Sequence, residues 1–239
     1  MAAPVAAASE EQSLPGNAGV VDGEFGMDDF TSLRRNMVDC QLRTYDITDR
    51  AALAAADSVP REAFVPENLS HLAYLDQSIP LPGTGRALMT PMVAVRMIQL
   101  LDPQPGETVL EYAGGSGYGA ALMADMEANA TLWEPDAAAR ALAEAALARA
   151  GASDVTVTAT QPANASFDAI LVSGACEVSP ETLFPLLRPE GRLVVVEGLG
   201  RAARVMLYMK SSDIVSGRPV FDAAAPVLSE FRRPAAFVF

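Results

Sequence analysis

The sequence is poor in cysteine, histidine and lysine, and each scarcity excludes a class of protein. Cys40, Cys176 and His71 are too few and too widely spaced for a typical zinc site, so no metal is expected. We expect the two cysteines to be free thiols in a reducing compartment. Lys210 is the only lysine among 17 basic residues, and the net charge is −13. Without clustered cations, neither nucleic acid nor an anionic membrane surface is an expected partner.

Long apolar runs are also missing. No stretch of 18 apolar residues exists, so no transmembrane helix is predicted. The first residues lack a basic segment ahead of an apolar one, which argues against a secretory signal and favours a cytoplasmic location. Residues 1–26 are rich in Ala, Gly and Pro without a helical or strand period, and we interpret them as a disordered tail. The remaining chain is long enough to bury one sizeable core.

Residues 27–91 are expected to form a helical and loop region. Apolar residues recur every three or four positions between Asp28 and Arg43, which predicts an amphipathic helix. Thr48 is a candidate N-cap for a second helix that runs until shortly before Pro60. Residues 77–91 are rich in proline and glycine and predict a long loop, a feature that is often functional.

Residues 92–239 alternate between helical and strand patterns. Expected helices cover 92–101, 118–127, an Ala-rich stretch with Pro135 in its first turn and Gly151 at its end, and 182–187. Expected strands cover 108–112, 130–134, 155–158, 167–173, 192–197, 205–209 and 235–239. This alternation predicts an α/β fold: a doubly wound, mostly parallel, Rossmann-like sheet with helices on both faces and an N-terminal helical extension.

The chemically informative segment is a glycine cluster between the first of these strands and the next helix. Glycines let the backbone approach a ligand closely and point the helix N-terminus at it. Glu134 closes the following strand, where a carboxylate can accept hydrogen bonds from both ribose hydroxyls of an adenosine cofactor. The residues expected to bind the cofactor are Glu111, Ala113, Gly114, Gly115, Ser116, Gly117 and Glu134.

Two cofactors are compatible with this segment. Gly115-x-Gly117-x-x-Ala120 satisfies the nicotinamide dinucleotide fingerprint. Two details favour S-adenosyl-L-methionine. Glu111, at the end of its strand, suits a cationic methionine portion but would repel a pyrophosphate. About a hundred residues also precede the motif, whereas dinucleotide folds usually begin with it.

Several segments in order along the chain resemble one family. They are Met37-Val38-x-x-Gln41-Leu42, Ile47-x-Asp49, Val59-Pro60-Arg61-Glu62-x-Phe64-Val65-Pro66, Ala73-Tyr74-x-Asp76, Leu110-Glu111 through Tyr118, Phe167 through Val172, and Gly191-Arg192-Leu193-Val194. Together they are similar to the protein-L-isoaspartate O-methyltransferases. The resemblance covers about residues 33–198 and implies a class I methyltransferase fold using S-adenosyl-L-methionine. It implies methylation of the α-carboxyl of isoaspartyl residues in proteins or peptides, a protein repair reaction. We expect a monomer or weak dimer.

The sequence departs from the family pattern at three places. Met89 stands where the family's loop has a serine thought to help position the substrate carboxylate, which leaves the adjacent Thr90 as the candidate catalytic hydroxyl. Ala113 replaces the first loop glycine, and Ala159-Thr160-Gln161-Pro162 replaces a Gly-Asp-Gly. Arg86, in the same loop as Met89, is either a partner for a substrate carboxylate or an ordinary surface arginine.

Three functions therefore remain open. The first is a carboxyl methyltransferase of the isoaspartyl-repair type, with weak activity or an altered substrate because a thioether cannot donate a hydrogen bond. The second is a non-catalytic family member that binds S-adenosyl-L-methionine, its product S-adenosylhomocysteine or a partner protein. The third is a nicotinamide-dependent oxidoreductase.

Overall fold

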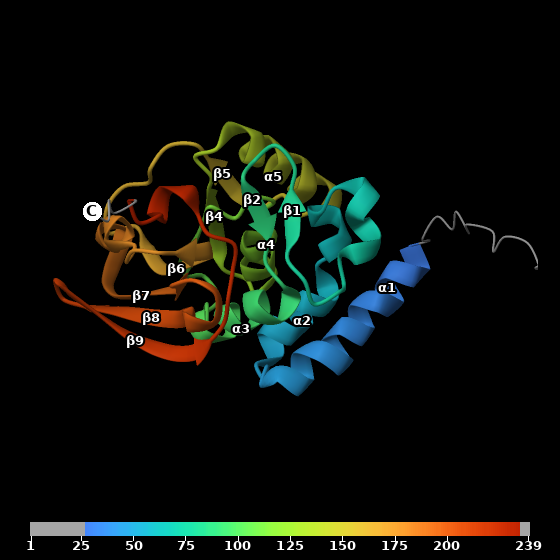
Figure 1. Ribbon diagram of the computed structural model, residues 1–239, viewed down its shortest axis with the longest axis horizontal. Coiled ribbons are helices and arrows are strands. Elements are labelled where there is room, and N and C mark those ends of the chain that lie inside the picture. The colour runs from blue at the N-terminus through green and yellow to red at the C-terminus, as the bar shows by residue number, and fades with distance from the viewer. Residues whose placement is uncertain (1–26, 235–239) are drawn as a thin grey trace, which may run out of the picture.

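The computed structural model describes residues 27–234; the predicted tail 1–26 and strand 235–239 lie outside them. Its centre is a seven-stranded sheet in the order β5-β4-β3-β6-β7-β8-β9. The first five strands in this order are parallel, and β8 and β9 add antiparallel neighbours at one edge (Figure 1). The strands are β3 (Thr108–Tyr112), β4 (Asn129–Trp133), β5 (Thr156–Thr158), β6 (Phe167–Cys176), β7 (Leu187–Glu197), β8 (Arg204–Ser211) and β9 (Ile214–Asp222). The predicted α/β class is confirmed.

The three α-helices that follow the N-terminal region pack on one face of this sheet. They are α3 (Pro91–Leu101), α4 (Tyr118–Asp125) and α5 (Ala137–Ala150), and they share a buried apolar cluster with Val109, Leu132 and Leu171 of the sheet. The opposite face carries Leu110 and Ile170 and is covered by the 3-10 turns η5 (Glu181–Leu186) and η7 (Ser229–Phe231). Helical segments thus cover both faces, as predicted, but those on the second face are short 3-10 helices, and the predicted helix 182–187 is η5.

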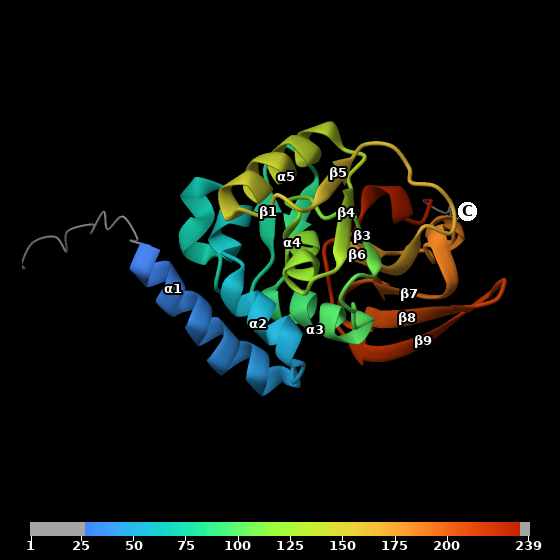
Figure 2. The ribbon, with the colours of Figure 1, turned by 180° about the vertical axis from the view of Figure 1, so that it is seen from behind.

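The N-terminal region wraps the same face as the α-helices (Figure 2). It contains α1 (Met27–Asn36), the helical turns η1 (Met37–Leu42) and η2 (Arg43–Tyr45), α2 (Arg50–Ser58), and the 3-10 segments η3 (Arg61–Phe64) and η4 (Glu67–Leu72). Its apolar side chains belong to the same cluster as α3 and α4, so a single core runs through both regions. A further 3-10 turn, η6 (Gly200–Ala202), precedes β8.

Two helix starts differ from prediction. Asp49, not Thr48, caps α2: its carboxylate accepts a hydrogen bond from Ala52 N at 2.7 Å. The backbone N–H of Thr48 is instead bound by Gln99. The Ala-rich α5 begins after Pro135, because Asp136 is its N-cap.

The predicted loop 77–91 contains a small β-hairpin. Its strands β1 (Ile79–Leu81) and β2 (Arg86–Leu88) pair antiparallel, and Gly83 and Gly85 take positive φ in the turn between them. Each strand has only three residues, and β1 contains Pro80, so neither shows the alternation of apolar and polar residues that predicts a strand. The hairpin lies against the glycine loop before α4, so the expected irregular loop is an ordered cover over the carboxyl ends of the strands (Figure 1).

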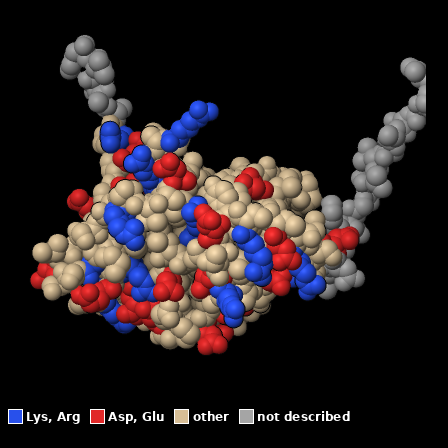
Figure 3. Space-filling model, turned by 90° about the horizontal axis from the view of Figure 1, so that it is seen from below, with Lys and Arg blue, Asp and Glu red and all other residues tan. Residues whose placement is uncertain are grey.

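Charged side chains of both signs are interspersed on the face shown in Figure 3. Within residues 27–234, no helix is long and apolar enough to span a membrane. In the same part of the chain, no group of His, Cys, Asp and Glu side chains is arranged to hold a metal ion.

Candidate active site

The glycine loop joins the end of β3 to the start of α4. Ala113, Gly115 and Gly117 have φ of 55°, 62° and 81°, so the backbone turns through three left-handed residues within five positions. Glycine adopts this conformation freely, whereas alanine pays a steric cost. Ala113, at the family's glycine position, is therefore a strained residue at the site.

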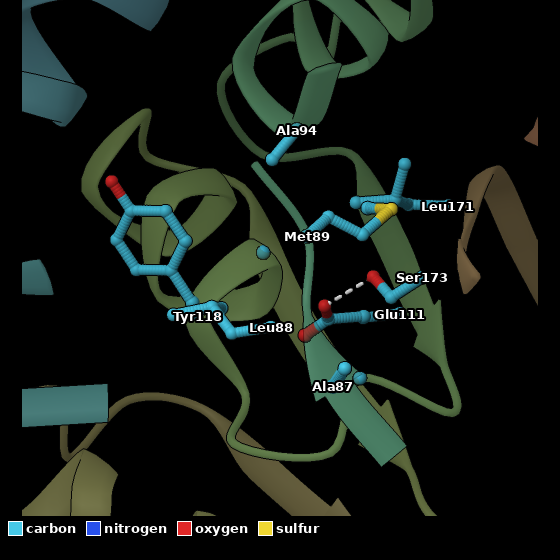
Figure 4. A pocket seen from close by; sticks show the side chains of 10 residues that line it. Ala87, Leu88, Met89, Ala94, Glu111, Tyr118, Leu171 and Ser173 are labelled. Atoms are coloured by element: carbon cyan, nitrogen blue, oxygen red, sulfur yellow. Dashed lines mark hydrogen bonds between the residues drawn. The ribbon is translucent and has the colours of Figure 1, made fainter. Parts of the chain in front are cut away.

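Glu111 lies inside this turn and is only 1% exposed. Its carboxylate accepts a hydrogen bond from the Ser173 hydroxyl at 2.5 Å (Figure 4). It accepts a second from Ala120 N at 2.8 Å. A Cβ added to Gly114 would lie 2.3 Å from the Glu111 carboxyl carbon, so only glycine lets the chain pass this close. Burial raises the pKa of Glu111 to about 6, and the hydrogen bonds from Ser173 and Ala120 limit the rise. Above pH 6 the site thus holds a buried anion.

Glu134, directly after β4, is fully buried and touches the same loop. Gly115 N donates to its Oε2 at 3.0 Å, and Asp136 N donates to its Oε1 at 3.0 Å. The acid and the glycine loop that sequence spacing assigned to one cofactor are therefore in direct contact. The role of each toward a ligand stays a prediction.

Arg86 joins Glu134 to the C-terminal segment. Its guanidinium donates to Glu134 Oε1 at 3.0 Å and to Glu230 Oε1 at 2.6 Å, and Tyr112 OH also donates to Glu230 at 3.3 Å. Arg86 is 7% exposed, so its interpretation as a surface arginine was wrong. Partial burial would raise the pKa of Glu230, but the hydrogen bonds from Arg86 outweigh it and lower that pKa to about 2. Local spacing could not predict this contact, because Glu230 is 144 residues from Arg86.

Met89 and Thr90 occupy different environments. Met89 is 4% exposed and, with Glu111 and Ser173, lines a small cavity beneath the hairpin (Figure 4). Thr90 is the N-cap of α3, and its hydroxyl oxygen accepts from Val93 N at 3.4 Å. The structure gives the Thr90 hydroxyl this capping contact, and its catalytic role stays a prediction.

A buried arginine that sequence reasoning did not single out as functional fixes the position of Met89. Arg61 is fully buried, and it donates to Met89 O at 2.5 Å and to Ala73 O at 2.7 Å. Its guanidinium lies 4.8 Å from the centroid of the Tyr118 ring, a cation–π contact. Its place in the Val-Pro-Arg-Glu motif was the available signal.

The polar groups at these strand ends fit an adenosine cofactor. Two carboxylates flank a glycine loop, and the Ser116 hydroxyl, 2% exposed, has no hydrogen-bond partner among the described residues. The space is different, however. The cavity beside Glu111 offers about 10 Å³ to the centre of a water molecule, room for one water. A cofactor of this size needs several hundred Å³, on the order of 300–1,000 Å³.

The sheet order, the glycine loop after β3 and the acid after β4 define a class I methyltransferase fold. The chain belongs to the protein-L-isoaspartate O-methyltransferase family, because the model of "Protein-L-isoaspartate(D-aspartate) O-methyltransferase" matches residues 33–221. A protein-L-isoaspartate O-methyltransferase of Methylorubrum extorquens is 42% identical over 177 residues, covering 71% of this chain and 76% of that protein. One of Methanoculleus marisnigri is 34% identical over 206 residues, covering 83% and 92%.

Solved structures show the same fold. A crystal structure from Plasmodium falciparum, described as a protein-L-isoaspartate O-methyltransferase in complex with S-adenosyl-L-homocysteine, matches with a TM-score of 0.69 at 18% identity. The match covers 84% of this chain and 98% of that one. The comparisons support neither a nicotinamide oxidoreductase nor a non-catalytic function.

Proposed function

We propose that this protein transfers the methyl group of S-adenosyl-L-methionine to the α-carboxylate of isoaspartyl residues in proteins or peptides. The observation that carries the proposal is the convergence of Glu111 and Glu134 on one glycine loop, each held by backbone N–H groups. The family's named relatives support the reaction and the kind of substrate. When bound, the cofactor supplies an electrophilic methyl group on a cationic sulfur.

The protein's own residues have binding and aligning roles. In this proposal Glu134 accepts hydrogen bonds from the ribose hydroxyls, and Glu111 balances the positive charge of the methionine portion. Methyl transfer to a carboxylate needs no general base, since the nucleophile is already an anion, so alignment is the main task of the site. Arg61 serves that task by fixing the backbone at Met89.

Met89 sets the expected level of activity. A thioether cannot donate a hydrogen bond to the substrate carboxylate, and Met89 lines the small cavity that Glu111 and Ser173 also line. A poorly satisfied carboxylate oxygen costs on the order of 1–3 kcal/mol, or about tenfold to a hundredfold in rate if it persists at the transition state. We therefore propose slow isoaspartyl methylation, in the cytoplasm, by a monomer or weak dimer; sedimentation tests the last point.

Methyl transfer from labelled cofactor tests the proposal. The substrate is an isoaspartyl peptide, and its control is the aspartyl peptide of the same sequence. Product that releases labelled methanol in mild base is a methyl ester and not a methylated amine. We expect slow, isoaspartyl-specific esterification that increases in Met89→Ser and is unaffected in Thr90→Ser, a matched hydroxyl-retaining control. Equal methylation of both peptides, or none in either enzyme despite cofactor binding, would contradict the proposed substrate.

A further inference from the structure

The β1–β2 hairpin lies on the part of the glycine loop that a cofactor needs. A Cβ added to Gly115 would lie 2.7 Å from Leu81 Cδ1 and 3.1 Å from Arg86 Cβ. Leu81 and Arg86 belong to the two strands of the hairpin. The hairpin thus rests directly on the backbone that contacts Glu134. The cavity between Met89, Glu111 and Ser173 accepts about one water.

Arg86 also takes the acceptor capacity that the ribose requires. Oε1 of Glu134 accepts hydrogen bonds from Nε and Nη2 of Arg86, at 3.3 and 3.0 Å, and a third from Asp136 N. Oε2 receives Gly115 N, and the side chain has no exposed surface. Two neutral hydroxyl donors bind a carboxylate less strongly than a guanidinium does. Cofactor and hairpin therefore compete for Glu134.

From this geometry we infer that Arg86 is a latch: it closes the hairpin over the cofactor site by occupying Glu134 in place of the ribose, and the cofactor binds only when the hairpin opens. This inference rests on the proposed function. Glu230 is the second part of the latch. Its carboxylate binds Arg86 through both oxygens, at 2.6 and 3.0 Å, and 28% of its side chain is exposed. Because it is not a predicted cofactor contact, Glu230 reports on the latch alone.

A latch makes an unusual prediction for an ion pair: its two partners have opposite effects. The apparent dissociation constant equals the intrinsic one divided by the open fraction, so a protein that is open one time in ten loses tenfold in affinity. Arg86→Ala should raise the affinity for S-adenosylhomocysteine by about tenfold or more. Glu134→Ala should lower it by about tenfold to a hundredfold, since it removes the ribose acceptor. If the ion pair had only a structural role, removal of either partner would weaken cofactor binding.

Calorimetric titration of the full chain tests this without relying on activity. Glu230→Gln is the conservative variant that keeps Glu134 and Arg86 in place, and it too should bind more tightly than the wild type. Arg188→Ala, which breaks an ion pair with Asp168 at the opposite end of β6, is the control and should bind as the wild type does. In Arg86→Ala, the affinities for S-adenosylhomocysteine and for the more positively charged S-adenosyl-L-methionine should rise by the same factor. If the variant acted only by removing a repelling positive charge, the affinity for S-adenosyl-L-methionine would rise more.

The outcomes separate the latch from the proposed function. Unchanged or weaker binding in both Arg86→Ala and Glu230→Gln, with normal wild-type binding, overturns the latch and leaves the proposed function standing. Binding in no variant overturns both. Hydrogen exchange of the unliganded protein adds a direct check: amides of residues 79–88 should exchange faster in Arg86→Ala, and equal rates count against the latch.

Discussion

The buried carboxylate of Glu111 makes stability fall with pH over a narrow range. The pKa of Glu111 is raised from its ordinary 4.5 to about 6 in the folded protein. Between these values the folded state binds more protons than the unfolded state, so the free energy of unfolding decreases as pH rises. A difference of about 1.5 between the two pKa values corresponds to about 2 kcal/mol, which is lost as pH rises from about 4.5 through 6 and is not regained above it.

The other shifted carboxylates act at lower pH. The pKa of Glu230 is lowered to about 2, so its contribution to stability appears between pH 2 and 4.5 as pH rises. Asp168 and Glu107 also have lowered pKa values and contribute in the same sense. Stability should therefore rise with pH up to about 4.5 and then fall through 6. The falling part belongs to Glu111.

Glu111→Gln should remove that fall. The amide is isosteric, its oxygen can accept from Ala120 N, and its NH₂ can donate to the Ser173 oxygen, so both of these hydrogen bonds can be kept. Urea unfolding followed by the fluorescence of Trp133, the single tryptophan, gives the free energy at each pH. Glu107→Gln is the control: it should lower stability but keep the fall. The reasoning would be refuted if the free energy of unfolding of the wild type did not change from pH 4.5 to 6, or if it fell equally in Glu111→Gln.

Three further predictions concern single positions. Ala113→Gly should stabilise the protein by about 1 kcal/mol, because Ala113 has φ of 55°; a lower melting temperature would contradict this. Asp49→Ala should lower the free energy of unfolding by about 1 kcal/mol because it removes the N-cap of α2, and Thr48→Ala should lower it much less. A larger loss in Thr48→Ala, measured from urea midpoints, would show that Thr48 is the cap. An aromatic disulfide reagent should modify Cys40 alone in the native protein, since Cys176 is buried and burial raises the pKa of its thiol. Rapid reaction of both thiols in the absence of denaturant would contradict this.

The sequence predicted the elements whose patterns are long and regular. β3 was predicted with its observed bounds, and α3 within one residue at its start, because buried strands and amphipathic helices have distinct periods. β9 was missed. It is an exposed edge strand interrupted by Gly217 and Pro219, so it has neither an apolar face nor a continuous β-forming run.

The site was predictable only as far as local spacing reaches. Glycine spacing and strand ends identified the loop and both acids. The partners of those acids come from elsewhere in the chain: Ser173 is 62 residues from Glu111, and Arg86 is 48 from Glu134. Such contacts depend on which strands are neighbours and on how the hairpin folds back, and a single sequence contains no record of either.

The C-terminal segment has a consequence for how the protein is made. Within residues 27–234, Glu230 lies after all the strands of the sheet, in a segment attached to the sheet by the bridge between Ala175 and Val227. Domains begin to fold while the ribosome is still adding residues. Arg86 and Glu134 are synthesised long before Glu230, so the nascent sheet can assemble with this arginine bound to a single carboxylate. The second carboxylate is added only after the seven described strands have been synthesised, so the contact between Arg86 and Glu230 that completes the cover over the strand ends cannot form before all of them exist.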